Sequence, residues 1–305
     1  SPLTLTLIGY MRTSLLTTAA LGVAFNAQFA NAWWNNGHMI TARVAYDTLQ
    51  AQSPLTLKKA EEYLKPLQYL NEHEANHSFV ECATFADDLK DKGMDYQSPW
   101  HFIDQPFFDG FNTTVLPENF NVTWSIKTMK KEIMKNKTDP DEGVSWALGD
   151  GFNLRLLIHY VGDIHQPLHT VSRFAEDFPN GDMGGNLFML AEKDGINELH
   201  ALWDSTIYEW DQDIPRPLSE EGWTQLGEIS QKLREEHKLS DQDIVEDLKK
   251  GEKEWAQEGY EISTSFLYNI EQNSLPSDEY VAEAQKIVHR RLALGGYRLA
   301  QVLTQ

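Results

Sequence analysis

The chain has 305 residues, of which 46 are acidic and 26 are lysine or arginine, so its net charge near pH 7 is −20. This charge argues against a broad basic surface that captures a polyanion. The single cysteine, Cys82, excludes an internal disulfide, so stability must come from the core or from bound metals. No linker or internal repeat divides the sequence, which is long enough for one large domain.

The first segment with a recognisable pattern is a secretory leader. From Met11 the chain has one arginine, an apolar run over 15–25 and an Ala-Asn-Ala triplet at 30–32, which are the three parts of a signal peptide. The apolar run has about eleven residues, and a helix needs roughly 20 to cross a bilayer, so we expect no membrane anchor. We therefore expect residues 1–32 to be cleaved off, residues 33–305 to form a single domain, and the protein to be secreted or periplasmic.

Helical periodicity dominates the remainder of the chain. Apolar residues recur at intervals of three and four over 37–52, 55–64, 73–90, 122–135, 143–164, 197–212, 219–236 and 277–303. The alternation typical of strands is scarce, and the turn-rich segment 181–195 is the best candidate for a hairpin. The sequence therefore predicts an all-α protein, a mainly helical single domain with at most a small β-hairpin. Facing helices of such a bundle can build an interior site.

Two of these helices carry side chains suited to bind metal. Each has a histidine and an aspartate four residues apart, which places both on one helix face; the pairs are His159 with Asp163 and His200 with Asp204. We expect Pro167 to end the first helix, so that His169 follows from a loop. Imidazole and carboxylate groups are preferred zinc ligands, so the pairs and the third histidine suit a site for several zinc ions.

A single pair with this spacing is more often an ordinary polar pair, and we expect His73 and His77, which share it, to lie on a solvated face. Two pairs within apolar sequence favour metal binding, because a buried carboxylate without a cation is costly. His165, between the pairs, is expected to contact a ligand without being one. Upstream, His38, Asp87 and His101 stand in contexts that also suit ligands.

Six motifs in order then resemble one family. They are W-x4-H at 33–38, A-D-x-x-K at 86–90, W-H-F-I-D at 100–104, H-x3-D-x-H-Q-P-L-H at 159–169, D-x-G-G-N at 182–186 and L-H-x-x-W-D at 199–204. Together they resemble the zinc-dependent single-strand-specific nucleases of fungi, plants and bacteria, the S-one/P-one nuclease family. The resemblance extends from Trp33 to the closing GGYRLAQVL at 295–303, and departs from fungal and plant members in lacking their disulfides.

The resemblance implies three zinc ions, each with its own ligands. The first would be held by Asp87, His101, His159 and Asp163, the second by His169, His200 and Asp204, and the third by His38, Asp163 and Trp33. Trp33 would bind through its main-chain amine and carbonyl, so cleavage after residue 32 would complete the third site. We expect the Trp33 indole to pack in the core and Trp34 to serve packing only.

The resemblance also implies the chemistry and the substrates. Lys90 would neutralise the transition-state phosphate, with Asp163 as the shared ligand of two ions, and bound zinc would activate water for in-line attack on phosphorus. Phe102, Asp104 and Asn186 correspond to a nucleobase pocket, where stacking needs an unpaired base. We therefore expect cleavage of single-stranded DNA and RNA to 5′-phosphate products and removal of the 3′-phosphate from 3′-nucleotides. The zinc ions would also make the cleft locally positive in an acidic protein.

Two other functions are compatible with a zinc site. The zinc-dependent phospholipase C of bacteria resembles this family in fold and site, but its last ligand pair is His-x3-Glu, and its histidine lies much further from the terminal tryptophan than His38 does. A zinc-binding protein without catalysis would explain the ligands but not the set Phe102, Asp104 and Asn186. We expect a monomer with no stable protein partner.

Overall fold

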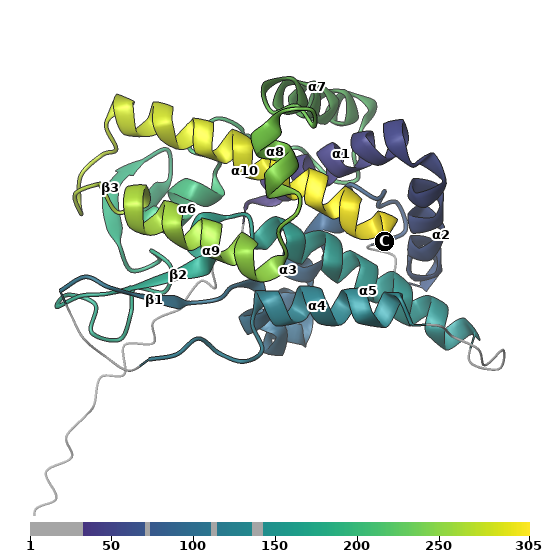
Figure 1. Cartoon of the computed structure of the whole chain (residues 1–305), viewed down its shortest axis with the longest axis horizontal. Helices are drawn as coiled ribbons and strands as arrows, with labels where there is room; N and C mark the ends of the chain where they lie inside the picture. Colours follow the sequence, from purple (N-terminus) through teal and green to yellow (C-terminus); the bar gives the residue numbers. More distant parts are fainter. Residues whose placement is uncertain (1–32, 71–73, 111–114, 136–142) are drawn as a thin grey trace, which may run out of the picture.

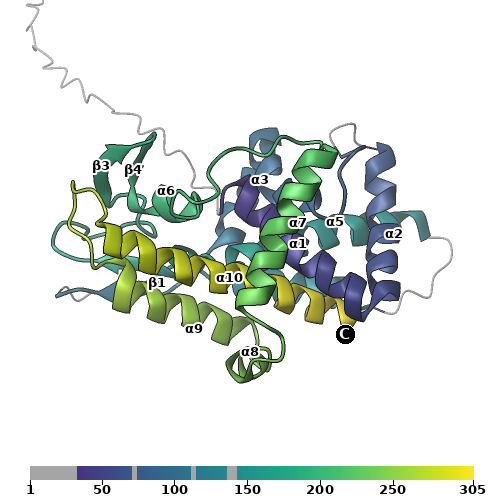
Figure 2. The same cartoon turned by 90° about the horizontal axis from the view of Figure 1, so that it is seen from above.

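The computed structural model describes residues 33–70, 74–110, 115–135 and 143–305. The expected leader, residues 1–32, lies outside them. The described chain is mainly helical, as the sequence predicted, and its helices surround a continuous hydrophobic core (Figures 1 and 2). None of these helices is both long enough and apolar enough to cross a membrane.

Three helices form the centre of the fold: α1 (Asn35–Gln52), α5 (Gly143–Asp163) and α10 (Asp278–Thr304). α1 packs along α10, and both contact α5 (Figure 2). Gly296 permits this close approach, because a Cβ at that position would lie only 2.5 Å from the Cβ of Val44. The two helices can therefore pack with their backbones close together only where α10 carries glycine.

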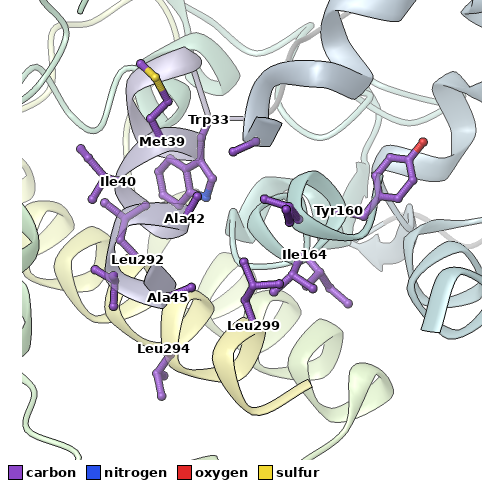
Figure 3. Packing of buried hydrophobic residues seen from close by; sticks show 14 of the residues in the cluster. Trp33, Met39, Ile40, Ala42, Ala45, Tyr160, Ile164, Leu292, Leu294 and Leu299 are labelled. Carbon is purple, nitrogen blue, oxygen red and sulfur yellow. The ribbon is translucent and has the colours of Figure 1, made fainter. Parts of the chain in front are cut away.

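The hydrophobic core lies among these three helices. Ile40 from α1 and Leu292 from α10 are fully buried, and the buried Trp33 indole lies near them, as expected (Figure 3). Tyr160 of α5 is also fully buried and projects from the other side of that helix. Trp34, in contrast, is 36% exposed, so it packs against the core only in part. Cys82 is buried, and burial raises the pKa of its thiol to about 12, so it is an inert core residue.

The outer helices are α2 (Pro54–Leu70), α4 (Val122–Ile133), α7 (Glu220–Glu236), α8 (Gln242–Asp247) and α9 (Glu252–Ile262). α2 and α4 pack on α5, and α7 packs on α1 (Figures 1 and 2). Apolar periodicity predicted α2, α4 and α7. It missed α8 and α9, because each is short and buries few side chains, with Ile244 the one buried residue of α8.

The segment predicted as one helix over 73–90 is broken into short turns. They are η1 (Glu81–Thr84), α3 (Phe85–Leu89), η2 (Lys90–Met94) and, following these, η3 (Asp95–His101). The carboxylate of Glu81 accepts hydrogen bonds from the main-chain N–H groups of Ser78 (2.8 Å) and Leu218 (2.6 Å). These bonds fix the chain in a non-helical path, and Gly93 turns it again with a φ of 83°.

The helix predicted over 197–212 is much shorter. It forms α6 (Leu199–Asp204) and then a left-handed turn, in which Thr206, Ile207 and Tyr208 have φ values of 57°, 55° and 64°. This conformation costs an L residue about 1–2 kcal/mol, and more for a β-branched side chain such as Ile207. Ile207 is fully buried, and its carbonyl accepts a hydrogen bond from Gln285 (3.0 Å), so tertiary contacts offset the local cost.

The β-structure consists of two small strand pairs. β3 (Met189–Lys193) and β4 (Ile196–Glu198) form an antiparallel hairpin through Asp194-Gly195, both with positive φ, as a two-residue hairpin turn requires. The predicted hairpin therefore exists, but it begins later than 181. β1 (Gln105–Phe108) and β2 (Val171–Phe174) pair in parallel, and this pair was not predicted.

A buried charge cluster attaches α9 and α10 to the end of α5. Arg291 donates to the carbonyls of Ile164 (3.1 Å) and His165 (3.0 Å), just beyond the last residue of α5, and also to Glu258 (2.7 Å). Arg298 donates two hydrogen bonds to Glu258 (2.8 Å each). Burial alone would raise the pKa of Glu258, but Arg298 and Arg291 hold it well below its ordinary value. The carboxylate thus stays charged and holds both guanidinium groups.

Replacing Glu258 should destabilise the protein strongly. Glu258→Gln leaves two buried guanidinium groups without their counter-ion, so the free energy of unfolding should fall by about 3–5 kcal/mol in chemical denaturation. Lys250→Ala is the matched control, because Lys250 contacts the same carboxylate but is 39% exposed, and should cost under about 1 kcal/mol. Equal losses from the two variants would show that the cluster does not stabilise the fold.

Candidate metal centre

All the predicted side-chain ligands gather in one buried region. Each is at most 9% exposed; they are His38, Asp87, His101, His159, Asp163, His169, His200 and Asp204. They come from α1, α3, η3, the last turn of α5, α6 and the turn η5 (Pro167–Thr170). α5 ends at Asp163, four residues before Pro167, and η5 then carries His169 back over the site.

The carboxylate of Asp163 lies at the centre. Four imidazole nitrogens lie within 4 Å of its oxygens: His101 Nδ1 at 2.9 Å, His159 Nε2 at 3.2 Å, His38 Nε2 at 3.4 Å and His169 Nδ1 at 3.9 Å. Neither oxygen accepts a hydrogen bond within the described chain, although the side chain is fully buried. A buried carboxylate in this state calls for a cation between it and the rings.

Main-chain carbonyls fix which nitrogen of three rings carries the proton. Nδ1 donates to a carbonyl oxygen in His159 (Ala83, 2.6 Å), in His169 (His101, 2.8 Å) and in His200 (Gly184, 2.7 Å). The neutral ring then presents a lone pair at Nε2. Since the partner of each Nδ1 is an acceptor only, the lone pair of each ring is at Nε2, the atom that can bind a metal. The Nε2 of His159 also contacts Nδ1 of His101 at 3.1 Å.

A second cluster consists of His169, His200 and Asp204, whose ligand atoms lie within 4.8 Å of one another. His200 Nε2 is 3.3 Å from Asp204 Oδ2, so a lone pair faces a carboxylate oxygen. Gln166 donates to the other oxygen, Oδ1 (2.7 Å), and so orients the carboxylate. Sequence reasoning missed Gln166, although it stands inside the H-Q-P-L-H motif.

The protonation states also suit a cation. Burial lowers the pKa values of His38, His101 and His169 well below the ordinary histidine range, with smaller contributions from neighbouring positive groups. Burial raises the pKa of Asp163 to about 6 and that of Asp204 well above its usual range. These three rings are therefore neutral near pH 7, and a cation that binds beside Asp204 would displace the proton of that carboxyl.

In His159, by contrast, burial lowers the pKa, but Asp163 and Asp87 outweigh it and raise the value overall. Asp87 lies beside the same rings, with Oδ1 3.6 Å from His101 Nδ1 and 3.7 Å from His159 Nε2. Lys90 Nζ is 2.8 Å from Asp87 Oδ1. Lys90, the predicted positive side chain, is thus at the site and contacts Asp87, one of the predicted ligands.

The N-terminal segment also reaches the site. The Trp33 indole donates to the carbonyl of Gly162 (3.2 Å), next to Asp163, and the N–H of Trp34 donates to the carbonyl of Asp204 (3.0 Å). Gly162 leaves room for His38, because a Cβ there would lie 2.7 Å from His38 Nδ1. The segment therefore lies between the residues of both clusters.

Asn36 holds this segment in place. Its amide nitrogen donates to the carbonyls of Trp210 and Gln212 (2.7 Å each), and its oxygen accepts from the N–H of Ile214 (3.1 Å). Asn36 is 3% exposed, so the chain after the left-handed turn covers it. Two adjacent asparagines before Gly37 are the only mark of this role in the sequence.

The predicted base-pocket residues lie beside the metal ligands. Phe102 and Asp104 lie one and three residues after His101, and both are partly exposed. Burial raises the pKa of Asp104 to about 7, with a further contribution from Asp182, which belongs to the turn that carries Asn186. The Asn186 amide donates to the carbonyl of Met183 (2.6 Å) within that turn.

Two expectations about other histidines are wrong. The ring nitrogens of His165 bond to the Val161 carbonyl (2.7 Å) and to Arg298 (2.9 Å), neither of which is a predicted ligand. His77 is 3% exposed and lies 3.4 Å from Glu74, so it is not on a solvated face. His73 lies outside the described residues.

Comparison with known proteins agrees with this geometry. The sequence is 25% identical to Endonuclease 3 of Arabidopsis thaliana, over 90% of this chain and 89% of that protein. It is 25% identical to Endonuclease 2 and 23% identical to Endonuclease 4 of the same plant, each over 90% of this chain and 90% and 89% of those proteins. Residues 33–305 match the S1/P1 Nuclease family. The chain therefore belongs to the S1/P1 nuclease family, and is a phosphoester hydrolase that acts on nucleic acid and prefers single strands.

Proposed function

We propose that this protein is a secreted phosphodiesterase with three zinc ions that cuts single-stranded DNA and RNA to 5′-phosphate products and removes 3′-phosphates from nucleotides. The observation that carries the proposal is the Asp163 carboxylate, which is fully buried, has no hydrogen-bond partner within the described chain, and lies within 3.4 Å of one ring nitrogen each of His38, His101 and His159. Family membership favours a nuclease over phospholipase C and over a zinc-binding protein without catalysis.

The ligand sets follow the two clusters and the N-terminal segment. One ion would be held by Asp87, His101, His159 and Asp163, one by His169, His200 and Asp204, and one by His38, Asp163 and the main chain of Trp33. The fixed tautomers of three rings and the unpaired atoms of His38, His101, Asp163 and His200 support these sets. Zinc bound here would act as a Lewis acid and acidify a water molecule to a nucleophile near neutral pH.

The side chains around the ions would orient the substrate. Lys90, 2.8 Å from Asp87 and 9% exposed, would place a positive charge beside the transferring phosphate. Phe102 would stack on a base, and Asn186 would hydrogen-bond its edge. With a pKa of about 7, the Asp104 carboxyl can both donate and accept hydrogen bonds near neutral pH. Single strands would be preferred, because a paired base is not free to stack.

The proposal also includes cleavage of the leader and a monomeric protein. Residues 1–32 would be a leader removed during secretion, and residues 33–305 one catalytic domain that works as a monomer. The position of Trp33 beside Gly162 and Asp204 supports a role for the processed terminus.

Removal of zinc should lower both activity and stability. The proposed ligands span residues 33 to 204, so bound metal would tie distant segments together. Metal that binds only the folded chain stabilises it by about 4 kcal/mol for each site when the free metal is at a thousand times its dissociation constant. Thermal unfolding and hydrolysis of single-stranded DNA, each with and without chelator, measure this, and re-addition of zinc is the control. Full activity in protein shown to be free of metal would refute the proposal.

Two aspartates should separate metal binding from base binding. Asp163→Asn should lose bound zinc and most activity, because Asp163 would be a ligand of two ions. Its carboxylate lies close to His101 of one proposed ion site and to His38 of the other. Asp104→Asn should keep the zinc but lose activity on dinucleotides more than on a phosphodiester without a base. Metal analysis and kcat/KM on both substrates test the division. It fails if the two variants retain zinc equally and lose the same activity on both substrates.

The N-terminus of the processed chain should matter as a ligand. In a longer chain the nitrogen of Trp33 is a planar amide with a delocalised lone pair, whereas a free amine, with a pKa of about 7.7–8.0, can lose its proton to a metal. One extra residue before Trp33 should therefore reduce bound zinc from three ions to two and strongly impair activity. Trp33→Ala with a correct terminus should keep part of the activity. Mass-verified forms with equal zinc content and equal rates would contradict this role.

A further inference from the structure

Four aromatic side chains form a chain of ring contacts beside the candidate base pocket, which we call the aromatic ladder: Tyr96, Trp100, Trp124 and Phe120. The ring centroids are 5.9 Å apart for Tyr96 and Trp100, 5.3 Å for Trp100 and Trp124, and 5.0 Å for Trp124 and Phe120. The two ends are largely exposed, Tyr96 by 62% and Phe120 by 58%. The two tryptophans between them are half-buried, so they hold two exposed rings on one surface. Exposed aromatic side chains grouped in this way suggest a ligand.

The aromatic ladder is rigidly attached to the segment of the metal centre. Trp100 immediately precedes the proposed ligand His101. The first turn of α4 bonds to this segment twice, from the N–H of Val122 to the carbonyl of Phe102 (3.0 Å) and from Ser125 Oγ to the carbonyl of Trp100 (3.1 Å). α4 packs against η3. The ladder therefore keeps a fixed position relative to the base pocket.

Two lysines continue this surface along α4. Lys127 and Lys131 lie three and seven residues after Trp124, so they share its helix face over roughly 10 Å. Both are exposed, and neither has an ion-pair partner among the residues with described positions. Lys130, on another face, pairs with Glu252 (2.8 Å). In a chain with a net charge of −20, two uncompensated lysines beside aromatic rings form a local site for an anion.

We propose that the aromatic ladder, with Lys127 and Lys131, binds the unpaired nucleotides of a substrate that extends beyond the base pocket. Aromatic rings stack with any base, and lysines contact the phosphates, which is how proteins bind single strands without sequence preference. A duplex would gain little here, because its base faces are already stacked. The inference rests on the proposed nuclease function and predicts that affinity increases with the length of the single strand.

The test compares long and short substrates. The double variant Tyr96→Ala, Phe120→Ala should bind a phosphorothioate oligothymidylate of about ten nucleotides about tenfold more weakly in fluorescence anisotropy. Its ratio of kcat/KM for the unmodified oligonucleotide over a dinucleotide should fall by a similar factor. Lys127→Ala, Lys131→Ala should reduce the slope of log affinity against log salt by about one unit. The conservative double variant Tyr96→Phe, Phe120→Tyr keeps a ring at both positions and should bind the oligonucleotide as the wild type does.

A control variant and the contrary results distinguish a failure of the aromatic ladder from a failure of the proposed function. Tyr69→Ala removes an aromatic side chain that is 83% exposed on α2, and should not change the length dependence. Unchanged oligonucleotide binding in the ladder variant, or an equal loss on the dinucleotide, would overturn the inference. A wild-type enzyme that binds the oligonucleotide but cleaves neither substrate would refute the proposed function alone, since the anisotropy comparison still decides whether the aromatic ladder is a binding site.

Discussion

Asp163 carries a carboxylate that is sealed from water and receives no hydrogen bond from the described chain. An isolated buried charge of this kind costs many kcal/mol unless a cation or a proton compensates it. Burial accordingly raises its pKa to about 6, and it lowers the pKa values of His38, His101 and His169 so that these rings stay neutral. The surroundings of Asp163 thus suit a bound cation, because no side chain of the described chain donates a hydrogen bond to its carboxylate.

Much of the remaining fold serves to hold that arrangement. α5 ends at Asp163, and Arg291 binds the two carbonyls that follow it, with Glu258 as counter-ion. The carbonyls of Ala83 and Gly184 orient rings that belong to other segments. Short turns rather than long helices carry most of the ligands, because each ligand must approach the centre from a different direction. A metal bound at these residues would therefore couple its affinity to the stability of the fold.

The sequence predicted what depends on local periodicity. The four-residue spacing of His159 with Asp163 and of His200 with Asp204 placed both pairs on helix faces, where the structure has them. It failed where tertiary contacts override local preference, as at Glu81, whose carboxylate bonds the N–H of Leu218 far along the chain. The parallel strand pair and the hydrogen bonds of Asn36 could not be predicted either, because both join segments that only the fold brings together.

The left-handed turn after α6 has a consequence for local stability. Thr206, Ile207 and Tyr208 adopt a conformation that none of them prefers, so this segment is held by its surroundings and would relax if they loosened. Asp204 lies on one side of the turn, and the residues that clamp Asn36 lie on the other. Opening at either side would therefore release strain that helps to open the other. The second metal cluster and the N-terminal segment thus belong to one cooperative unit, which opens and closes together rather than residue by residue.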